Sequence, residues 1–211
     1  MEPFTKVTGI AAALPSANID TDVIMPKQFL KGVDRSGLDI GLFHDLRFDE
    51  HGHERPQFIL NQPKWRDAVF LVVGPNFGCG SSREHAVWGL MQYGIRALIG
   101  TTFSGIFFDN CARNGLLAIS LSEPEIADLV KLAETDAASP MTVDLGNQTV
   151  STGAHKIGFN IDPIRREALL NGRDAIGQTL DSRSEIASFE AMHLRKNPWF
   201  SAGLRDRQVL T

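Results

Sequence analysis

The sequence predicts an α/β fold with a mixed sheet, in which parallel strands are joined by crossover helices. Three observations lead to this prediction: short continuous apolar runs, helical periodicity between them, and glycine or proline where each element must end. The order strand, helix, strand, helix, strand over residues 68–138 is typical of βαβ units. Short strand patterns predominate after Pro140, so the sheet is expected to be mixed.

The first predicted βαβ unit is the most sharply defined. The run Ala68–Val73 is short and continuously apolar, as expected for a strand that is buried on both faces. A glycine-rich loop follows, and then a helix over 81–93, where Ser81 and Glu84 have capping-box spacing. Gly94 stands where a left-handed residue would end this helix.

The remaining elements follow the same rules. We expect strands at 96–100, 116–121, 141–145, 148–151 and 156–161, and helices at 104–114, 122–138, 163–171 and 182–195. The first seventy residues show little strand periodicity and are expected to consist mainly of loops. The chain is thus predicted to form a single domain over residues 1–211, with a helical C-terminal extension from about residue 180.

Composition excludes several classes of protein. With 21 basic and 25 acidic residues the net charge is −4, which argues against binding nucleic acid through bulk charge. No apolar run approaches the roughly 20 residues of a membrane span, and the N-terminus lacks a signal-peptide pattern. Two cysteines exclude a disulfide scaffold and favour a reducing compartment, so a cytoplasmic location is expected. They are also too few for an iron–sulfur cluster, which needs about four ligands.

The segment Gly78–His85 has the composition of an anion-binding turn. Glycines let the backbone approach a ligand, and the helix that follows offers unpaired N–H groups at its positive end. The guanidinium of Arg83 is suited to holding a carboxylate or phosphate through two hydrogen bonds. The spacing alone leaves open a plain strand-to-helix turn in which Ser81 caps the helix and Arg83 is solvated.

A second candidate segment lies near the N-terminus. Asp20 and Asp22 are two residues apart, a spacing compatible with metal ligation, acid–base chemistry or ordinary turn and cap hydrogen bonds. The run Lys27–Lys31 follows and mixes basic with apolar residues, as in a loop that faces a substrate or in an amphipathic surface. The spacing alone does not separate these interpretations.

Taken together, these motifs resemble the small subunits of the 3-isopropylmalate dehydratase family, in the aconitase superfamily. The resemblance extends over nearly the whole chain, in the right order. It rests on DTDVIMPKQFL at 20–30, NFGCGSSREHA at 76–86, FSGIF at 103–107 with Asn110 and GLL at 115–117, and DPIRR at 162–166 with GRDAIG at 172–177.

The resemblance implies a swivel-type domain of β/β/α architecture, which acts with a separate large subunit as a heterodimer. That large subunit would carry a [4Fe–4S] cluster, and no metal or cofactor would be bound by this chain. The implied reaction is reversible dehydration and rehydration of an isopropylmalate in leucine biosynthesis. The expected partners are therefore the large subunit and a small dicarboxylate, without nucleic acid or membrane.

The resemblance also implies roles for individual residues. Ser81 would be the catalytic base and would act as an alkoxide, and Arg83 would stabilise the developing charge while holding a substrate carboxylate. Substrate binding would also involve Ser82, Asp22 and Lys31, with Asp22 orienting the site.

Two alternatives stay open. One is the small subunit of a related hydro-lyase, of the homoaconitase or methylmalate/citraconate type. The loop at 27–37 would contact the variable side group, but it offers both apolar residues and the cations Lys27, Lys31 and Arg35. The other alternative is a non-catalytic anion-binding module that uses the turn at 78–83.

Overall fold

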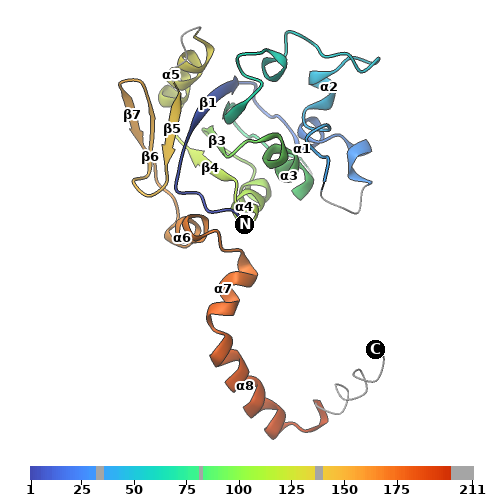
Figure 1. Ribbon diagram of the computed structural model, residues 1–211, viewed down its shortest axis with the longest axis vertical. Coiled ribbons are helices and arrows are strands. Elements are labelled where there is room, and N and C mark those ends of the chain that lie inside the picture. Colours follow the sequence, from blue (N-terminus) through green and yellow to red (C-terminus); the bar gives the residue numbers. More distant parts are fainter. Residues whose placement is uncertain (32–35, 81–82, 136–139, 201–211) are drawn as a thin grey trace. The chain divides into compact units, whose positions relative to one another are not determined.

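The computed structural model describes residues 1–31, 36–80, 83–135 and 140–200. Contacts within the chain divide it into two compact units, Met1–Gly172 and Arg173–Thr211. The first unit holds the sheet, and the described part of the second unit holds the helices α7 and α8 (Figure 1). No helix within the described ranges is long and apolar enough to cross a membrane.

The first unit is built on one seven-stranded sheet with the order β4-β3-β2-β1-β5-β6-β7. The pairs β1–β2, β2–β3 and β3–β4 are parallel, whereas β1–β5, β5–β6 and β6–β7 are antiparallel. The sheet therefore changes type at β1. The strands are β1 (Lys6–Leu14), β2 (Ala68–Val73), β3 (Ala97–Gly100), β4 (Leu117–Ser120), β5 (Met141–Asp144), β6 (Thr149–Thr152) and β7 (His155–Gly158).

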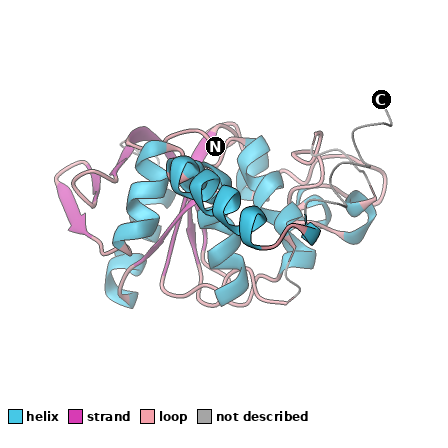
Figure 2. Cartoon of the chain, turned by 90° about the horizontal axis from the view of Figure 1, so that it is seen from below, coloured by secondary structure: helices cyan, strands magenta, loops and turns pink. Residues whose placement is uncertain are grey.

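Crossover helices join the parallel strands, as the sequence predicts. α3 (Glu84–Tyr93) connects β2 to β3, and α4 (Gly105–Asn114) connects β3 to β4. Figure 2 shows the helices and strands of the chain from below. The remaining helices are α1 (Thr21–Ile24), η1 (Lys27–Leu30), α2 (His44–Arg47), η2 (Ile59–Asn61), α5 (Glu123–Glu134), α6 (Pro163–Asn171), α7 (Ala175–Asp181) and α8 (Arg183–Lys196).

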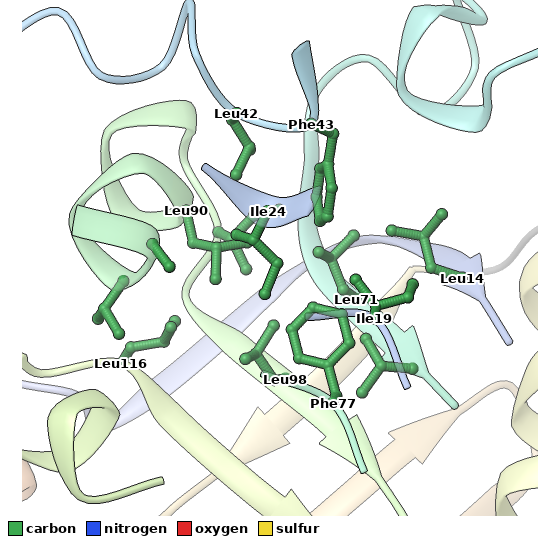
Figure 3. Close-up of a cluster of buried hydrophobic side chains, with 14 of the residues drawn as sticks. Leu14, Ile19, Ile24, Leu42, Phe43, Leu71, Phe77, Leu90, Leu98 and Leu116 are labelled. Atoms are coloured by element: carbon green, nitrogen blue, oxygen red, sulfur yellow. The ribbon is translucent and has the colours of Figure 1, made fainter. Parts of the chain in front are cut away.

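Hydrophobic clusters cover both faces of the parallel part of the sheet. Along β2, Leu71 and Val73 belong to one cluster, whereas Phe70 and Val72 belong to the other. Successive strand residues point to opposite faces, so both faces of β2 are buried and its sequence is continuously apolar. The first cluster, drawn in Figure 3, is completed by side chains of α3 and α4, and the second by side chains of α5 and α6.

The predicted fold class is confirmed, and the first seventy residues are mainly loops, but one strand in this region is not predicted by its sequence. The central strand of the sheet is β1, in the region expected to be mainly loops. Its sequence KVTGIAAAL contains three β-branched residues but no clear alternation of apolar and polar residues, and its buried half, residues 11–14, consists mostly of alanines that pack between the two hydrophobic clusters. A Cβ atom on Gly9 would lie 2.3 Å from Cγ2 of Val69 on the neighbouring strand.

Two predicted helix ends also need correction. α3 begins at Glu84, with Arg83 in extended conformation as its N-cap. The expected capping box requires Glu84 to be the third residue of the helix, whereas it is the first. α5 ends at Glu134, earlier than the expected end near residue 138, since Thr135 is already extended. The short helix α7 was not anticipated, whereas α8 lies within one residue of its predicted bounds.

Other predicted boundaries are confirmed by their local chemistry. Gly94, Gly115 and Gly172 all adopt left-handed conformations after α3, α4 and α6, where a residue without Cβ is favoured. The side chain of Asp162 accepts a hydrogen bond from the backbone N–H of Arg165 at 3.0 Å and so caps α6. The division into one swivel-type domain and a C-terminal extension stays a prediction.

The capping box of α5 gives a test of stability. Ser122 donates from its backbone N–H and its hydroxyl to Oε2 of Glu125, at 2.9 and 2.6 Å, and these bonds lower the pKa of Glu125. We expect Ser122→Ala to reduce the free energy of unfolding by about 1 kcal/mol at pH 7, measured by urea denaturation. Ser120→Ala, at an exposed position of β4, is the matched control and should change it by less than about 0.5 kcal/mol.

The hydrogen bonds between Ser122 and Glu125 also predict how the stability loss in Ser122→Ala depends on pH. A carboxyl whose pKa is lower in the folded state stabilises the protein above its unfolded-state pKa, about 4.3 for Glu, and loses that contribution as the pH falls through the folded pKa. The difference in the free energy of unfolding between Ser122→Ala and the parent chain should therefore be smaller at about pH 3 than at pH 7. An equal difference at both values would contradict this account.

Candidate active site

The three sequence motifs converge because each follows a parallel strand. The segment containing Asp20 follows β1, the glycine-rich turn follows β2, and the segment beginning at Thr101 follows β3. Since these strands are parallel, their carboxyl ends lie along one edge of the sheet. In open α/β sheets this edge is where ligands bind.

Backbone hydrogen bonds hold the first two segments side by side. The N–H of Gly78 donates to the carbonyl of Ile19 at 2.8 Å, and the N–H of Thr21 donates to the carbonyl of Cys79 at 2.9 Å. Asp20 and Cys79 form a parallel β-bridge between these bonds. The two motifs thus extend the pairing of β1 with β2 beyond the sheet.

The third segment is joined to the same turn. Phe77 accepts from the N–H of Ser104 at 3.0 Å, and the N–H of Asn76 donates to Oγ1 of Thr102 at 2.8 Å. Phe77 is buried beneath the turn and packs edge-on against Phe107 of α4, with ring centroids 5.6 Å apart. Phe107 of the third motif is therefore part of the core that supports the turn.

Glycine is required within the turn itself. Gly78 has a φ angle of +74°, and a Cβ atom there would lie 2.2 Å from Cγ of Phe107. Gly80 has a φ angle of +91°, also in the left-handed region. At Gly78 the chain can follow this path only without a side chain, and at Gly80 the left-handed backbone favours glycine.

Two of the predicted site residues are in direct contact. An Nη1 group of Arg83 donates to Oδ1 of Asp22, forming an ion pair between the turn after β2 and the short helix α1. Asp20 holds α1 in place by accepting a hydrogen bond from the N–H of Val23 at 2.8 Å. Arg83 is the N-cap of α3, so its guanidinium lies at the positive end of that ten-residue helix.

The environment of this pair leaves it able to bind an anion. The Arg83 side chain is 19% exposed and that of Asp22 44% exposed, so the pair is only partly withdrawn from water. Within the described part of the chain, the contact with Asp22 engages only Nη1 among the five N–H donors of the guanidinium. Because a carboxylate accepts and cannot donate, Asp22 can orient Arg83 but cannot itself bond to a substrate carboxylate.

The other predicted site residues are not placed in this contact. Lys31 is exposed at the C-terminal end of η1, and no ion pair joins it to Asp22 within the described residues. Ser81 and Ser82 lie outside the described residues, although both neighbours in the chain, Gly80 and Arg83, belong to the site.

A polar network that the sequence did not indicate supports the start of α3. Asn114, at the end of α4, donates from Nδ2 to Oε1 of Glu84 at 3.2 Å and accepts at Oδ1 from Nε1 of Trp88 at 2.8 Å. The network fixes the first turn of α3, next to Arg83, against α4. Its signal in the sequence is weak, since a polar residue at a helix end is ordinarily solvated.

Neither cysteine is grouped with further metal-ligating side chains in the part of the chain that the structure describes. Cys111 is completely buried in the first hydrophobic cluster, and this burial raises the pKa of its thiol. Cys79 lies in the turn and is paired through its backbone with Asp20. Among the described residues, no group of three or more His, Cys, Asp or Glu side chains is placed to hold a metal ion.

Comparison with known proteins agrees with the motifs. Residues 1–124 match the model of the aconitase C-terminal domain family, and residues 127–163 match a second model, LeuD_N. The chain is 55% identical over 199 residues to 3-isopropylmalate dehydratase small subunit 1 of Mannheimia succiniciproducens, a match covering 94% of this chain and 98% of that protein. The chain belongs to the 3-isopropylmalate dehydratase small-subunit family. Small subunit 2 of Salmonella typhimurium is 53% identical, covering 94% of this chain and 96% of its own length.

The fold of this small-subunit family is also found in a solved structure. The crystal structure of 3-isopropylmalate dehydratase (leuD) from Methanocaldococcus jannaschii is similar with a TM-score of 0.63 and 25% identity, covering 88% of this chain and 99% of that chain. The resemblance deduced from the motifs is thereby confirmed. The members of this family are small subunits of a hydro-lyase of the aconitase superfamily. This favours a 3-isopropylmalate dehydratase small subunit over the small subunit of a related hydro-lyase and over a non-catalytic anion-binding module.

The packing of the turn predicts opposite effects at two glycines. Gly78→Ala should reduce the free energy of unfolding by at least about 1–3 kcal/mol, because the methyl group meets the Phe107 ring at a left-handed position. Gly105→Ala is the matched change, since its Cβ would be in open space at the first residue of α4. It should raise the free energy of unfolding by about 0.4–1 kcal/mol. Urea denaturation of the full chain measures both, and a loss at Gly105 equal to that at Gly78 would contradict this description of the turn.

Proposed function

We propose that this chain is the small subunit of a 3-isopropylmalate dehydratase and that it works only together with a large subunit. The complex would interconvert 2-isopropylmalate and 3-isopropylmalate in leucine biosynthesis by removing water and adding it back at the neighbouring carbon. The observation that carries this proposal is the Asp22–Arg83 pair, located where the three family motifs meet. The names of the relatives, each a small subunit of this enzyme, supply the substrate and the partner.

The residues at the turn suit the first chemical step. Removing a proton from the carbon next to a carboxylate needs a base and stabilisation of the negative charge that spreads onto that carboxylate. Ser81 would take the proton as an alkoxide, and its anion would be stabilised by the amides at the start of α3 and by Arg83. Arg83, held by Asp22, would bind the substrate carboxylate, with Ser82 donating to the same group.

Two further parts of the proposal concern regions beyond this contact. Lys31 and the rest of the loop at 27–37 would face the substituent that distinguishes one malate from another. The large subunit would carry the [4Fe–4S] cluster, which would supply Lewis-acid chemistry for the departing hydroxyl. The complex would work in the cytoplasm.

The proposal is tested by co-expressing the chain with a candidate large subunit and assaying the isomerase anaerobically. Activity should require both chains, and the complex should contain iron that the purified small subunit lacks. Activity of the small subunit alone, or an inactive complex that has its full complement of iron, would contradict the proposal.

Arg83→Lys tests the binding of the carboxylate. Lysine keeps the charge but loses the planar arrangement of donors that binds a carboxylate through two hydrogen bonds. Loss of one charge-assisted hydrogen bond, about 1.5–3 kcal/mol, should reduce kcat/KM of the complex roughly 10- to 150-fold. Arg113→Lys, an exposed change at the end of α4, is the control and should leave kcat/KM unchanged. A fully active Arg83→Lys complex would refute the assignment.

The two serines should be separable by kinetics. If Ser81 is the base, Ser81→Ala removes a group that acts mainly in the transition state, so kcat should fall by about 10²–10⁴-fold with little change in KM. If Ser82 only binds the carboxylate, Ser82→Ala should mainly raise KM, by the equivalent of about 0.5–3 kcal/mol. Both variants must first be shown to assemble with the large subunit. The reverse pattern would exchange the two roles, and normal kcat in both would place the base on the other chain.

A further inference from the structure

The side-chain amide of Asn114 joins the end of α4 to the first turns of α3. Its Nδ2 group donates to Oε1 of Glu84 at 3.2 Å, and its Oδ1 atom accepts from Nε1 of Trp88 at 2.8 Å. Glu84 and Trp88 are four residues apart, so their side chains lie on the same face of α3. One amide thus links this face of α3 to α4, the helix beside it (Figure 1).

The two contacts require a group that donates on one side and accepts on the other. A carboxylate accepts and cannot donate, whereas an indole N–H donates and cannot accept. The amide of Asn114 meets both requirements, and it also donates to the carbonyl of Asn110 within α4, at 2.9 Å. An aspartate at position 114 would keep the acceptor for Trp88 but would place a second carboxylate against that of Glu84.

Glu84 directly follows the residue that would bind the substrate. Arg83 pairs with Asp22, and the described part of the chain contains no ion pair between Arg83 and Glu84, although these two residues are neighbours. The Glu84 carboxylate is bound by Asn114 instead. A further carboxylate on Arg83 would occupy N–H donors that a substrate carboxylate needs.

We infer that Asn114 is a positioning residue that holds the Glu84 carboxylate away from the Arg83 guanidinium. This inference rests on the proposed function, in which Arg83 binds a substrate carboxylate, and it adds a role for a residue outside the family motifs. Asp22 orients the guanidinium, and Asn114 keeps a competing carboxylate off the donors that Asp22 leaves open. Once released, Glu84 would oppose substrate binding, and substrate at high concentration would displace it.

The experiment is a double-mutant cycle in the complex with the large subunit. Asn114→Asp keeps the size of the side chain and the acceptor for Trp88 but repels Glu84. KM for 3-isopropylmalate should rise roughly 5- to 50-fold, within the range of couplings between residues in contact, while kcat stays within about 2-fold. A constant kcat separates competition for Arg83 from a general distortion of the site.

Glu84→Gln tests whether the released carboxylate causes the rise in KM. In the parent background it should change KM by less than about 2-fold, since the amide oxygen of glutamine still accepts from Asn114. In the Asn114→Asp background it should return KM to within about 3-fold of the parent value, because the glutamine amide donates to the aspartate. The bond to Asn110 is lost in both complexes with aspartate at position 114, so its loss cannot explain the rescue.

Asn171→Asp is the matched control, because Asn171 has the same local surroundings at the end of α6. Its Nδ2 group donates to the carbonyl of Glu167, four residues earlier, at 2.9 Å, and Gly172 follows in left-handed conformation. This bond lies within α6 and does not involve α3. The substitution should lower the thermal unfolding temperature slightly and leave KM and kcat within about 2-fold of the parent values.

Asn114→Ala keeps the inference testable if the aspartate variant does not assemble with the large subunit. It releases Glu84 without adding a charge, so KM should rise in the same direction. Glu84→Gln should again reverse the rise.

Three results would overturn the inference: an unchanged KM in an assembled Asn114 variant, a fall in kcat that exceeds the rise in KM, or an equal effect of Glu84→Gln on KM with and without the substitution at Asn114. The third result would mean that the Glu84 charge acts at a distance and not by contact with Arg83. Failure of the proposed function has a different signature, since the parent complex would then show no isomerase activity. An active parent complex combined with any of the three results rejects the role of Asn114 alone.

Discussion

The parallel pairing of β1 with β2 is the interaction on which the position of the site depends. It brings Leu14 opposite Val73, so that the chain leaves both strands at the same edge of the sheet. The pairing then continues through the hydrogen bonds between Ile19 and Gly78, and Asp22 and Arg83 meet as a result. An antiparallel β1 would place its exit at the opposite edge and separate the two charges.

Close approach of backbone segments is the second constraint, and glycine satisfies it. The turn after β2 runs against Phe107 at Gly78, and α3 runs against Met25 at Gly89. In both places an added Cβ would lie within 2.2 Å of a side-chain carbon atom. Side chains in such a packed interior interdigitate with few voids, so the site has little freedom to shift relative to the sheet.

Much of the fold could be predicted from the sequence because the central elements have strong local signals. β2, the C-terminal ends of α3 and α4 and the capping box of α5 depend on apolar runs, glycines and short-range hydrogen bonds. β1 has a weaker signal, since its alanines are explained only by the two hydrophobic clusters packed against it and its glycine by the Val69 side chain of β2. Its place in the sheet is a tertiary property that overrides local propensity.

The site divides in the same way between local and long-range information. The motifs identified Asp22 and Arg83 separately, but these residues are 61 positions apart in the chain, and nothing in their local sequences indicates their contact. The Asn114 network and the bond from Leu38 to Gln92 also join distant positions, through side chains that are unremarkable in the sequence. Periodicity locates elements, whereas contacts of this kind follow from the topology of the sheet.

The central place of β1 has a consequence for the order of folding. Its partner on the antiparallel side is β5, and the bond between the hydroxyls of Thr8 and Thr142 spans 134 positions. During synthesis, β1 therefore leaves the ribosome long before that side of its hydrogen-bonding edge can be covered. Pairings of such long range have a high entropic cost and slow the folding of a domain. Completion of the sheet is thus a late event, and one edge of its innermost strand stays open to association with other chains until β5 has been made.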